Sequence, residues 1–242
     1  MTETHNADVH RFANGIQVYK RDLLPVQLER YADHGNVHEP VEEFWLEKLL
    51  SEIDAPTVSF LDIGCALGYY SLLVRRRFPS ADIVAVDPNP EMGEKFWQTL
   101  ALNDAEDEGV SFLSQAIFPD SATVRLALKT FSTHVVQPNQ QHTQKAAEEI
   151  SVPAIDLPTL LKRIARPIDI AKMDIQGAEL DVLQQAAGIL KDGQVAHWLI
   201  GTHSAYIHRS LLELLSEAYE IVFEESAPKG QPDGLITAAY RK

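Results

Sequence analysis

Val58-Ser-Phe-Leu-Asp-Ile-Gly-Cys-Ala-Leu-Gly-Tyr-Tyr-Ser-Leu-Leu73 is the stretch of sequence that decides the fold. An apolar run ends in Asp62, and Gly64 and Gly68 come before an apolar pattern with helical spacing. This order predicts a strand, a tight glycine turn and a helix, which together let a nucleotide-like ligand approach bare backbone. A second apolar run ends in Asp87, 19 residues after Gly68, where a carboxylate at a strand tip can hold a ribose diol. The two runs predict an adenosine-containing cofactor above the first two strands.

Strands and helices alternate around this stretch, which predicts a largely parallel sheet with helices on both faces. The expected strands are Val58–Ile63, Ile83–Val86, Val110–Leu113, Ile168–Met173, Ala196–Gly201, Glu220–Phe223 and Leu235–Tyr240. The expected helices cover residues 39–51, 69–78, 91–103, 157–165, 178–190 and 209–218. Only a loop containing Pro and Gly separates the last two strands, so they must form an antiparallel hairpin at the edge of the sheet. We therefore expect an α/β, Rossmann-like sheet of seven strands, parallel except for the last.

Two polar regions lie outside this alternation. Residues 1–40 are expected to form an N-terminal extension or lid that folds over a domain spanning 41–242. Residues 123–128 alternate like an exposed strand or a hairpin arm. Residues 129–149 resemble a loop or lid, with helical character near Gln144–Glu149.

The composition restricts the partners and the compartment. The 35 acidic and 21 basic residues give a formal charge of -14, which repels phosphate backbones and makes nucleic acid an unsuitable partner. Cys65 is the single cysteine, so an intramolecular disulfide is impossible. No apolar stretch approaches the ~20 residues of a membrane span. The first residues lack the basic start and the apolar core of a signal peptide, so we expect a cytoplasmic protein without membrane contact.

The glycine spacing distinguishes two adenosine cofactors. A dinucleotide requires Gly-x-Gly-x-x-Gly, whereas this chain has Asp62-x-Gly64-x-x-x-Gly68. S-adenosylmethionine has no phosphate but carries an ammonium and a sulfonium, which suit the carboxylate of Asp62. Gln115, after the third strand, can face the adenine amino group or the solvent. The alternative is that the two glycines only make a turn and that Asp62 only caps the helix.

Three segments together resemble the FkbM-type S-adenosylmethionine-dependent methyltransferases: Phe60–Gly68, Val86–Pro90 and Ile170–Leu180. The last is similar to the family signature Lys-x-Asp-[Val/Ile]-[Glu/Gln]-Gly-x-Glu, and the likeness covers about residues 40–240. It implies a class I methyltransferase fold, an enzyme of class 2.1.1, and methylation of hydroxyl oxygens on sugars, polyketides and other secondary metabolites. The expected cofactor-binding residues are Asp62, Gly64, Ala66, Gly68, Tyr70, Asp87, Pro88, Gln115 and Asp174.

The reacting groups are expected at the ends of the fourth and fifth strands. Brändén's rule places Asp174 beside the transferred methyl, where it can orient a histidine, hold the acceptor or bind a metal. His203 is the predicted general base, with a histidine that bonds only to backbone as the equal alternative. We expect Tyr31, His34 and His38 to line the pocket of a small-molecule acceptor.

Several alternatives remain open at this point. A divalent ion held by Asp174, His203 and an N-terminal histidine is the less favoured choice, because no zinc signature is present, and no metal is expected. A nicotinamide-dependent oxidoreductase, an N-methyltransferase and a non-catalytic binding module are the other functional classes. A homodimer with the N-terminal segment at its interface is also compatible with the sequence.

Overall fold

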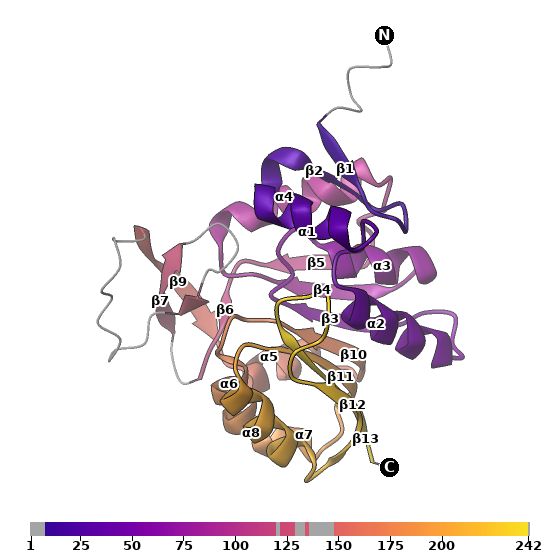
Figure 1. Ribbon diagram of the computed structural model, residues 1–242. Coiled ribbons are helices and arrows are strands. Elements are labelled where there is room, and N and C mark those ends of the chain that lie inside the picture. The colour runs from indigo at the N-terminus through magenta and orange to yellow at the C-terminus, as the bar shows by residue number, and fades with distance from the viewer. Residues whose placement is uncertain (1–7, 120–121, 129–133, 136–147, 242) are drawn as a thin grey trace.

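The computed structural model describes residues 8–119, 122–128, 134–135 and 148–241, and its central feature is a seven-stranded sheet (Figure 1). The strand order is β12-β13-β11-β10-β3-β4-β5. The strands are β3 (Ser59–Ile63), β4 (Asp82–Val86), β5 (Val110–Leu113), β10 (Ile168–Met173), β11 (Val195–Thr202), β12 (Tyr219–Glu225) and β13 (Gly234–Tyr240). Only β13 runs antiparallel to its neighbours, β11 and β12, and the other pairs are parallel. The expected Rossmann-like architecture is confirmed.

Helices cover both faces of this sheet because alternate residues of each strand point to opposite sides. Phe60 packs into a buried cluster with α2 (Pro40–Glu52), α3 (Tyr69–Arg77) and α4 (Pro90–Leu102). Leu61, its neighbour, packs into a second cluster on the other face. The helices of that face are α5 (Leu157–Ile164), α6 (Glu179–Gln185), α7 (Ala187–Leu190) and α8 (Ala205–Leu215).

Two of the predicted helices differ from the observed ones. The expected helix over 178–190 is two helices, α6 and α7. The expected helix over 209–218 begins earlier than predicted, because the Ser204 hydroxyl accepts a hydrogen bond from Ile207 N at 3.1 Å and caps α8.

The glycine turn between β3 and α3 is as tight as the sequence predicts. Gly64 and Gly68 both have φ of +82°, a conformation that L side chains rarely adopt. A Cβ on Gly64 would lie 1.8 Å from the carbonyl oxygen of Asp174, and a Cβ on Gly68 would lie 2.7 Å from the ring of Phe96. The two glycines therefore let the turn pack directly against the end of β10 and against α4.

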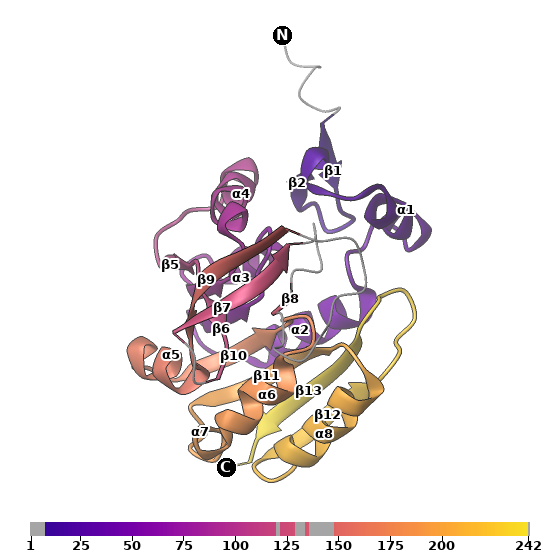
Figure 2. The same cartoon turned by 90° about the vertical axis from the view of Figure 1, so that its left-hand side faces the viewer.

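The N-terminal segment is more ordered than its polar composition suggests. It forms a hairpin of β1 (Val9–Arg11) and β2 (Gln17–Tyr19), a 3-10 helix (Lys20–Asp22) and α1 (Pro25–Asp33). Four of its side chains lie in the same core cluster as α2, α3 and α4: Phe12, Ile16, Val18 and Tyr31. These buried residues attach the segment to the sheet domain, and both views place β1 and β2 at the opposite end of the molecule from α7 and α8 (Figures 1 and 2).

A second, four-stranded sheet was not predicted from the sequence. It consists of β6 (Ala116–Ile117), β9 (Glu148–Ile155), β7 (Thr123–Leu128) and β8 (His134–Val135), in that order (Figure 2). The expected strand over 123–128 is present as β7. The predicted helical character near Gln144–Glu149 is wrong for residues 148 and 149, because they begin β9 and pair with β7. The rest of that prediction, and most of the expected lid, falls outside the described residues. No helix within the described ranges is long and apolar enough to cross a membrane.

Candidate active site

A cavity of about 490 Å³ lies at the carboxyl ends of β3, β4, β5 and β10. Seven of the predicted site residues line it: Gly64, Ala66, Asp87, Pro88, Gln115, Asp174 and His38. This position follows from the parallel strands, whose connecting loops leave a crevice where the order of the sheet reverses. The volume of the cavity lies within the range of about 300–1,000 Å³ that is usual for small-molecule sites.

Asp87 is held in one orientation by the backbone. Its Oδ2 accepts a hydrogen bond from Ala66 N at 3.0 Å, and its Oδ1 accepts one from Asn89 N at 2.9 Å. Burial raises the pKa of Asp87 to about 6, although these hydrogen bonds oppose the shift. The carboxylate is ionised at neutral pH and lies beside Pro88 in the wall of the cavity.

Three predicted cofactor residues do not line this cavity: Tyr70, which lines a smaller cavity described below, and Asp62 and Gly68, which line neither. Asp62 has no solvent exposure, and its Oδ2 accepts a hydrogen bond from Ser71 Oγ at 2.7 Å. The reason is strand alternation, since Asp62 lies on the same face of β3 as Phe60 and points beneath α3. Gly68 caps α3 and packs against Phe96. Asp62 and Gly68 therefore support the conformation of the glycine turn from within the protein, and neither residue faces the cavity.

A smaller cavity of about 90 Å³ continues from the larger one past the glycine turn. Tyr70 and Tyr31 line the smaller cavity, and His38, Glu39 and Asp174 line both. The predicted substrate residue His34 lines neither, because its Nδ1 lies 2.8 Å from the carbonyl oxygen of Arg30 within its own helix turn. The structure thus brings Tyr31 and His38 to the site and leaves His34 outside it.

Lys172 lies beneath the junction of the two cavities and is 2% exposed. Its Nζ is 3.2 Å from Glu42 Oε1 and 3.7 Å from Asp174 Oδ2, and it lies 4.5 Å from the centre of the Tyr70 ring. Burial opposes the charge of Lys172, but the surrounding carboxylates outweigh that effect and raise its pKa. Lys172 therefore remains a cation that neutralises part of a buried acidic cluster.

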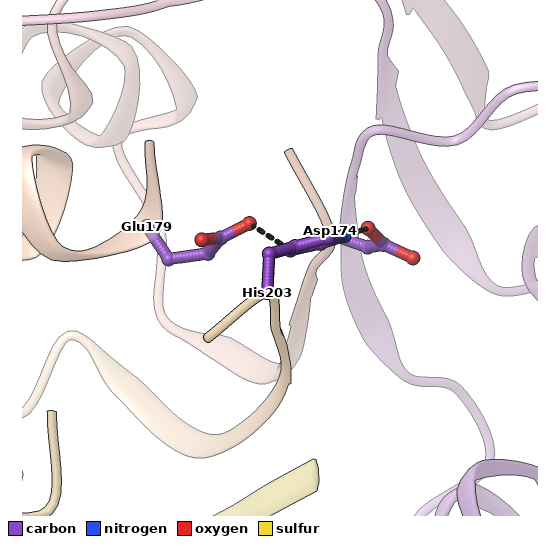
Figure 3. Close-up of side chains that lie close together, drawn as sticks. All are labelled: Asp174, Glu179 and His203. Atoms are coloured by element: carbon purple, nitrogen blue, oxygen red, sulfur yellow. Dashed lines mark ion pairs between the residues drawn. The ribbon is translucent and has the colours of Figure 1, made fainter. Parts of the chain in front are cut away.

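His203 is enclosed by three carboxylates, and Figure 3 shows two of them, those of Asp174 and Glu179. Its Nδ1 lies 2.8 Å from Glu179 Oε1, and its Nε2 lies 3.3 Å from Asp174 Oδ1 and 3.5 Å from Asp233 Oδ1. Burial would lower the pKa of this histidine, but Asp174 and Glu179 raise it to about 11. A ring that keeps both protons at neutral pH has no lone pair to accept another. This arrangement does not favour the predicted role of His203 as general base and points to a positively charged positioning group.

Asp174, Glu179 and His203 form the one cluster among the described residues whose side chains could hold a metal ion. The ligand atoms of Asp174, Glu179 and His203 lie within 4.8 Å of one another. However, the imidazole lies between the two carboxylates, and each ring nitrogen faces one of them (Figure 3). A protonated ring already supplies the positive charge that these carboxylates require. The absence of a metal stays a prediction.

Sequence reasoning missed several residues of the site. Glu39, Arg30, Asn89 and Asp233 all line the larger cavity. Arg30 is the only Lys or Arg in that lining, as far as the structure describes it. Glu39 and Arg30 lie in a segment without a recognisable motif. Asp233 lies in the loop that precedes β13, and this loop reaches the site because β13 lies between β11 and β12. The available signal was Lys172, a buried cation in β10, whose other charged residue, Asp169, is only partly buried.

The fold is similar to that of solved methyltransferases. One example is the methyltransferase FkbM from Methylobacillus flagellatus KT, with a TM-score of 0.52 and 14% identity over 78% of this chain and 45% of that chain. At this identity the likeness concerns the fold alone.

Two curated proteins with sequences similar to this chain are named as methyltransferases. Methyltransferase sdnD of Sordaria araneosa is 28% identical over 172 residues, which cover 59% of this chain and 66% of that protein. Methyltransferase 1 of Beauveria bassiana (strain ARSEF 2860) is 24% identical over 160 residues, covering 59% of this chain and 64% of that protein. The chain thus matches about two thirds of the length of these curated relatives.

The seven-stranded sheet with only β13 antiparallel is the fold of class I methyltransferases, a class of S-adenosylmethionine-dependent enzymes. A family model described as the methyltransferase FkbM domain matches residues 62–228, well over half of the chain. The chain belongs to the FkbM methyltransferase family.

Proposed function

We propose that the protein transfers the methyl group of S-adenosylmethionine to a hydroxyl oxygen of a small molecule. The observation that carries this proposal is the pair of carboxylates, Asp174 and Asp233, that lines the larger cavity and faces Nε2 of His203. A hydroxyl becomes a good nucleophile only when its proton is removed, and a carboxylate at the methyl group provides the acceptor for that proton.

The cofactor is proposed to lie across the carboxyl ends of β4 and β3. Asp87 accepts hydrogen bonds from the ribose hydroxyls, and Pro88 and Gln115 lie beside the adenine. Gly64 and Ala66 allow the sulfur to approach the backbone of the turn. This placement leaves the transferable methyl near Asp174, at the end of β10, which agrees with the position of ligands at the ends of parallel strands.

The reaction is an in-line displacement. The hydroxyl oxygen attacks the methyl carbon, the carbon–sulfur bond breaks, and its electron pair moves to sulfur, which leaves S-adenosylhomocysteine. The hydroxyl proton passes to the carboxylate of Asp233 and from there to water. Burial and the neighbouring acids raise the pKa of Asp233 to about 6, whereas Lys172 and His203 hold the pKa of Asp174 low. Asp233 is therefore the better base, and Asp174 and His203 position it and the acceptor.

The lining of the cavity supports a small, partly apolar acceptor. Besides the acids, the walls include Leu24, Val26, Leu126, Ile175 and Pro232. The formal charge of -14 disfavours a nucleic acid, because each bound phosphate would meet a repulsive field. Sugars, polyketides and related hydroxylated metabolites satisfy both conditions.

The test combines the protein with S-adenosylmethionine and matched pairs of small alcohols and amines, and it measures S-adenosylhomocysteine together with the position of the new methyl by NMR. We expect methylation on oxygen. Asp233→Asn should lower kcat by about a hundredfold or more while leaving the affinity for S-adenosylhomocysteine unchanged. The matched control is Asp192→Asn, an exposed acid at the opposite end of the strands. Transfer to nitrogen, or full activity of Asp233→Asn, would overturn the proposal.

A further inference from the structure

Glu39 is a buried carboxylate at the junction of the two cavities. It precedes α2, is 6% exposed and lines both cavities. Its Oε2 accepts a hydrogen bond from the Tyr70 hydroxyl at 2.6 Å. Within the described ranges, no residue donates a hydrogen bond to its other oxygen, Oε1. One oxygen is therefore fixed by the protein, and the other remains available to a ligand.

Among the described residues, no Lys or Arg forms an ion pair with the carboxylate of Glu39. Its ion-pair partner in the described structure is Nε2 of His38 at 3.8 Å, and burial lowers the pKa of that histidine, which disfavours the charged form of the ring. Burial would raise the pKa of Glu39, but His38, Lys172 and the Tyr70 hydroxyl lower it, so the carboxylate is ionised. Asp174, in contrast, already pairs with Lys172 and His203. An anion in this position favours a ligand that brings a positive charge.

We propose that Glu39 binds the ammonium group of the methionyl part of S-adenosylmethionine, and that the smaller cavity receives this amino-acid end. The inference rests on the proposed placement of adenosine beside Asp87, because Gly64 and Ala66 line both cavities and connect the two positions. An ammonium carries three N–H donors that match a carboxylate oxygen, whereas the sulfonium has no proton to donate. Glu39 therefore recognises the amino acid and not the reacting sulfur.

Residues outside the family match would then form part of the cofactor site. The FkbM domain match begins at residue 62, and Glu39 lies upstream of it. The start of α2 is anchored from two sides. Glu43 Oε1 accepts from His38 N at 2.7 Å, and Gln231 Oε1 accepts from Val41 N at 3.1 Å. The N-terminal segment is thus held in place as a wall of the cofactor site.

The test compares two ligands by calorimetry: S-adenosylhomocysteine, which has the ammonium, and 5′-methylthioadenosine, which lacks the amino-acid end. Glu39→Gln should weaken S-adenosylhomocysteine by about ten- to a hundredfold, the value of a charged hydrogen bond, and should leave 5′-methylthioadenosine unchanged. Glu47→Gln, an exposed residue of the same helix, is the matched control and should change neither affinity. A second measurement needs no variant: the wild-type protein should bind the deaminated analogue of S-adenosylhomocysteine about tenfold or more weakly than the parent.

The outcomes separate this inference from the proposed function. Equal weakening of both ligands by Glu39→Gln, or equal wild-type affinity for the parent and the deaminated analogue, would overturn the role of Glu39. Wild-type binding of S-adenosylhomocysteine together with transfer to nitrogen would overturn O-methylation and leave Glu39 in place.

Discussion

Nδ1 of His203 lies 2.8 Å from Oε1 of Glu179, a carboxylate with no exposure to solvent. The same oxygen accepts hydrogen bonds from Ile175 N at 3.1 Å and Gly177 N at 3.0 Å, which hold the turn that follows β10. The histidine at the end of β11 is thus joined to the turn that carries Asp174. This pair determines the shape of the site as well as its charge.

Removing the imidazole should therefore destabilise the fold. His203→Ala leaves Glu179 buried without its cation, and we expect the free energy of unfolding to fall by about 3 kcal/mol. Urea denaturation measures the change. His197→Ala is the control and should cost less, because the Nδ1 of this half-buried histidine of β11 bonds to a backbone oxygen, that of Asp169 in β10, and not to a buried carboxylate. Unchanged stability with lost turnover would show that His203 acts as a reactive group instead.

The raised pKa of His203 beside Glu179 predicts how the free energy of unfolding depends on pH. The pKa of His203 rises from 6.5 to about 11 in the folded protein, so its stabilising contribution is complete below pH 6.5 and is lost as the pH rises towards 11. Between about pH 7 and pH 10, wild-type stability should fall by at most about 1.4 kcal/mol per pH unit more than that of His203→Gln. Parallel pH profiles of the two proteins would contradict the raised pKa.

Cofactor affinity should depend on the ionisation of Asp87. With a pKa of about 6, this carboxylate loses an acceptor for the ribose hydroxyls as the pH falls, so S-adenosylhomocysteine should bind more weakly at about pH 5 than at about pH 8. Asp87→Asn should bind about tenfold more weakly at neutral pH and lose this dependence. Asp82→Asn, at the opposite end of β4, should behave as the wild type. A pH-independent wild-type affinity would remove Asp87 from the ribose site.

The glycine turn predicts a sharp contrast between two substitutions. Gly64→Ala places a Cβ 1.8 Å from the Asp174 carbonyl oxygen at φ +82°, so it should cost at least about 2 kcal/mol of stability. Gly188→Ala, in α7, meets no atom within 4 Å and should be neutral or stabilise by up to about 1 kcal/mol. Thermal and urea unfolding of both variants measure the difference. Similar stabilities would mean that the turn rearranges away from β10.

Metal removal should leave the site intact. The charged imidazole lies between Asp174 and Glu179, so we expect EDTA to change neither the melting temperature nor the turnover. Added Mg²⁺, Mn²⁺ or Zn²⁺ should produce no saturable increase in melting temperature. A loss of activity with EDTA that Mg²⁺ restores would show instead that the three side chains hold a metal.

Much of the cofactor side of the site was predictable because it depends on local patterns. Gly64 and Asp87 follow apolar runs at fixed spacing, and strand tips of a parallel sheet meet at one edge. The pattern did not show that Asp62 points beneath α3, since that depends on which face of β3 packs against the helix. The second sheet was also missed, because β7 pairs with β9 across about 20 residues of intervening chain.

The sequence by itself determined the class of fold, the family and the cofactor, because glycine turns, strand periodicity and strand-tip acids act over short distances along the chain. Only the tertiary structure decided the charge and role of His203 and the place of Glu39 at the junction of the cavities. The raised pKa of His203 results from Asp174 and Glu179, which follow β10, whereas His203 follows β11. The pKa at such a position depends on the burial of the group and on the charges of neighbouring side chains. These neighbours come together only when the chain folds.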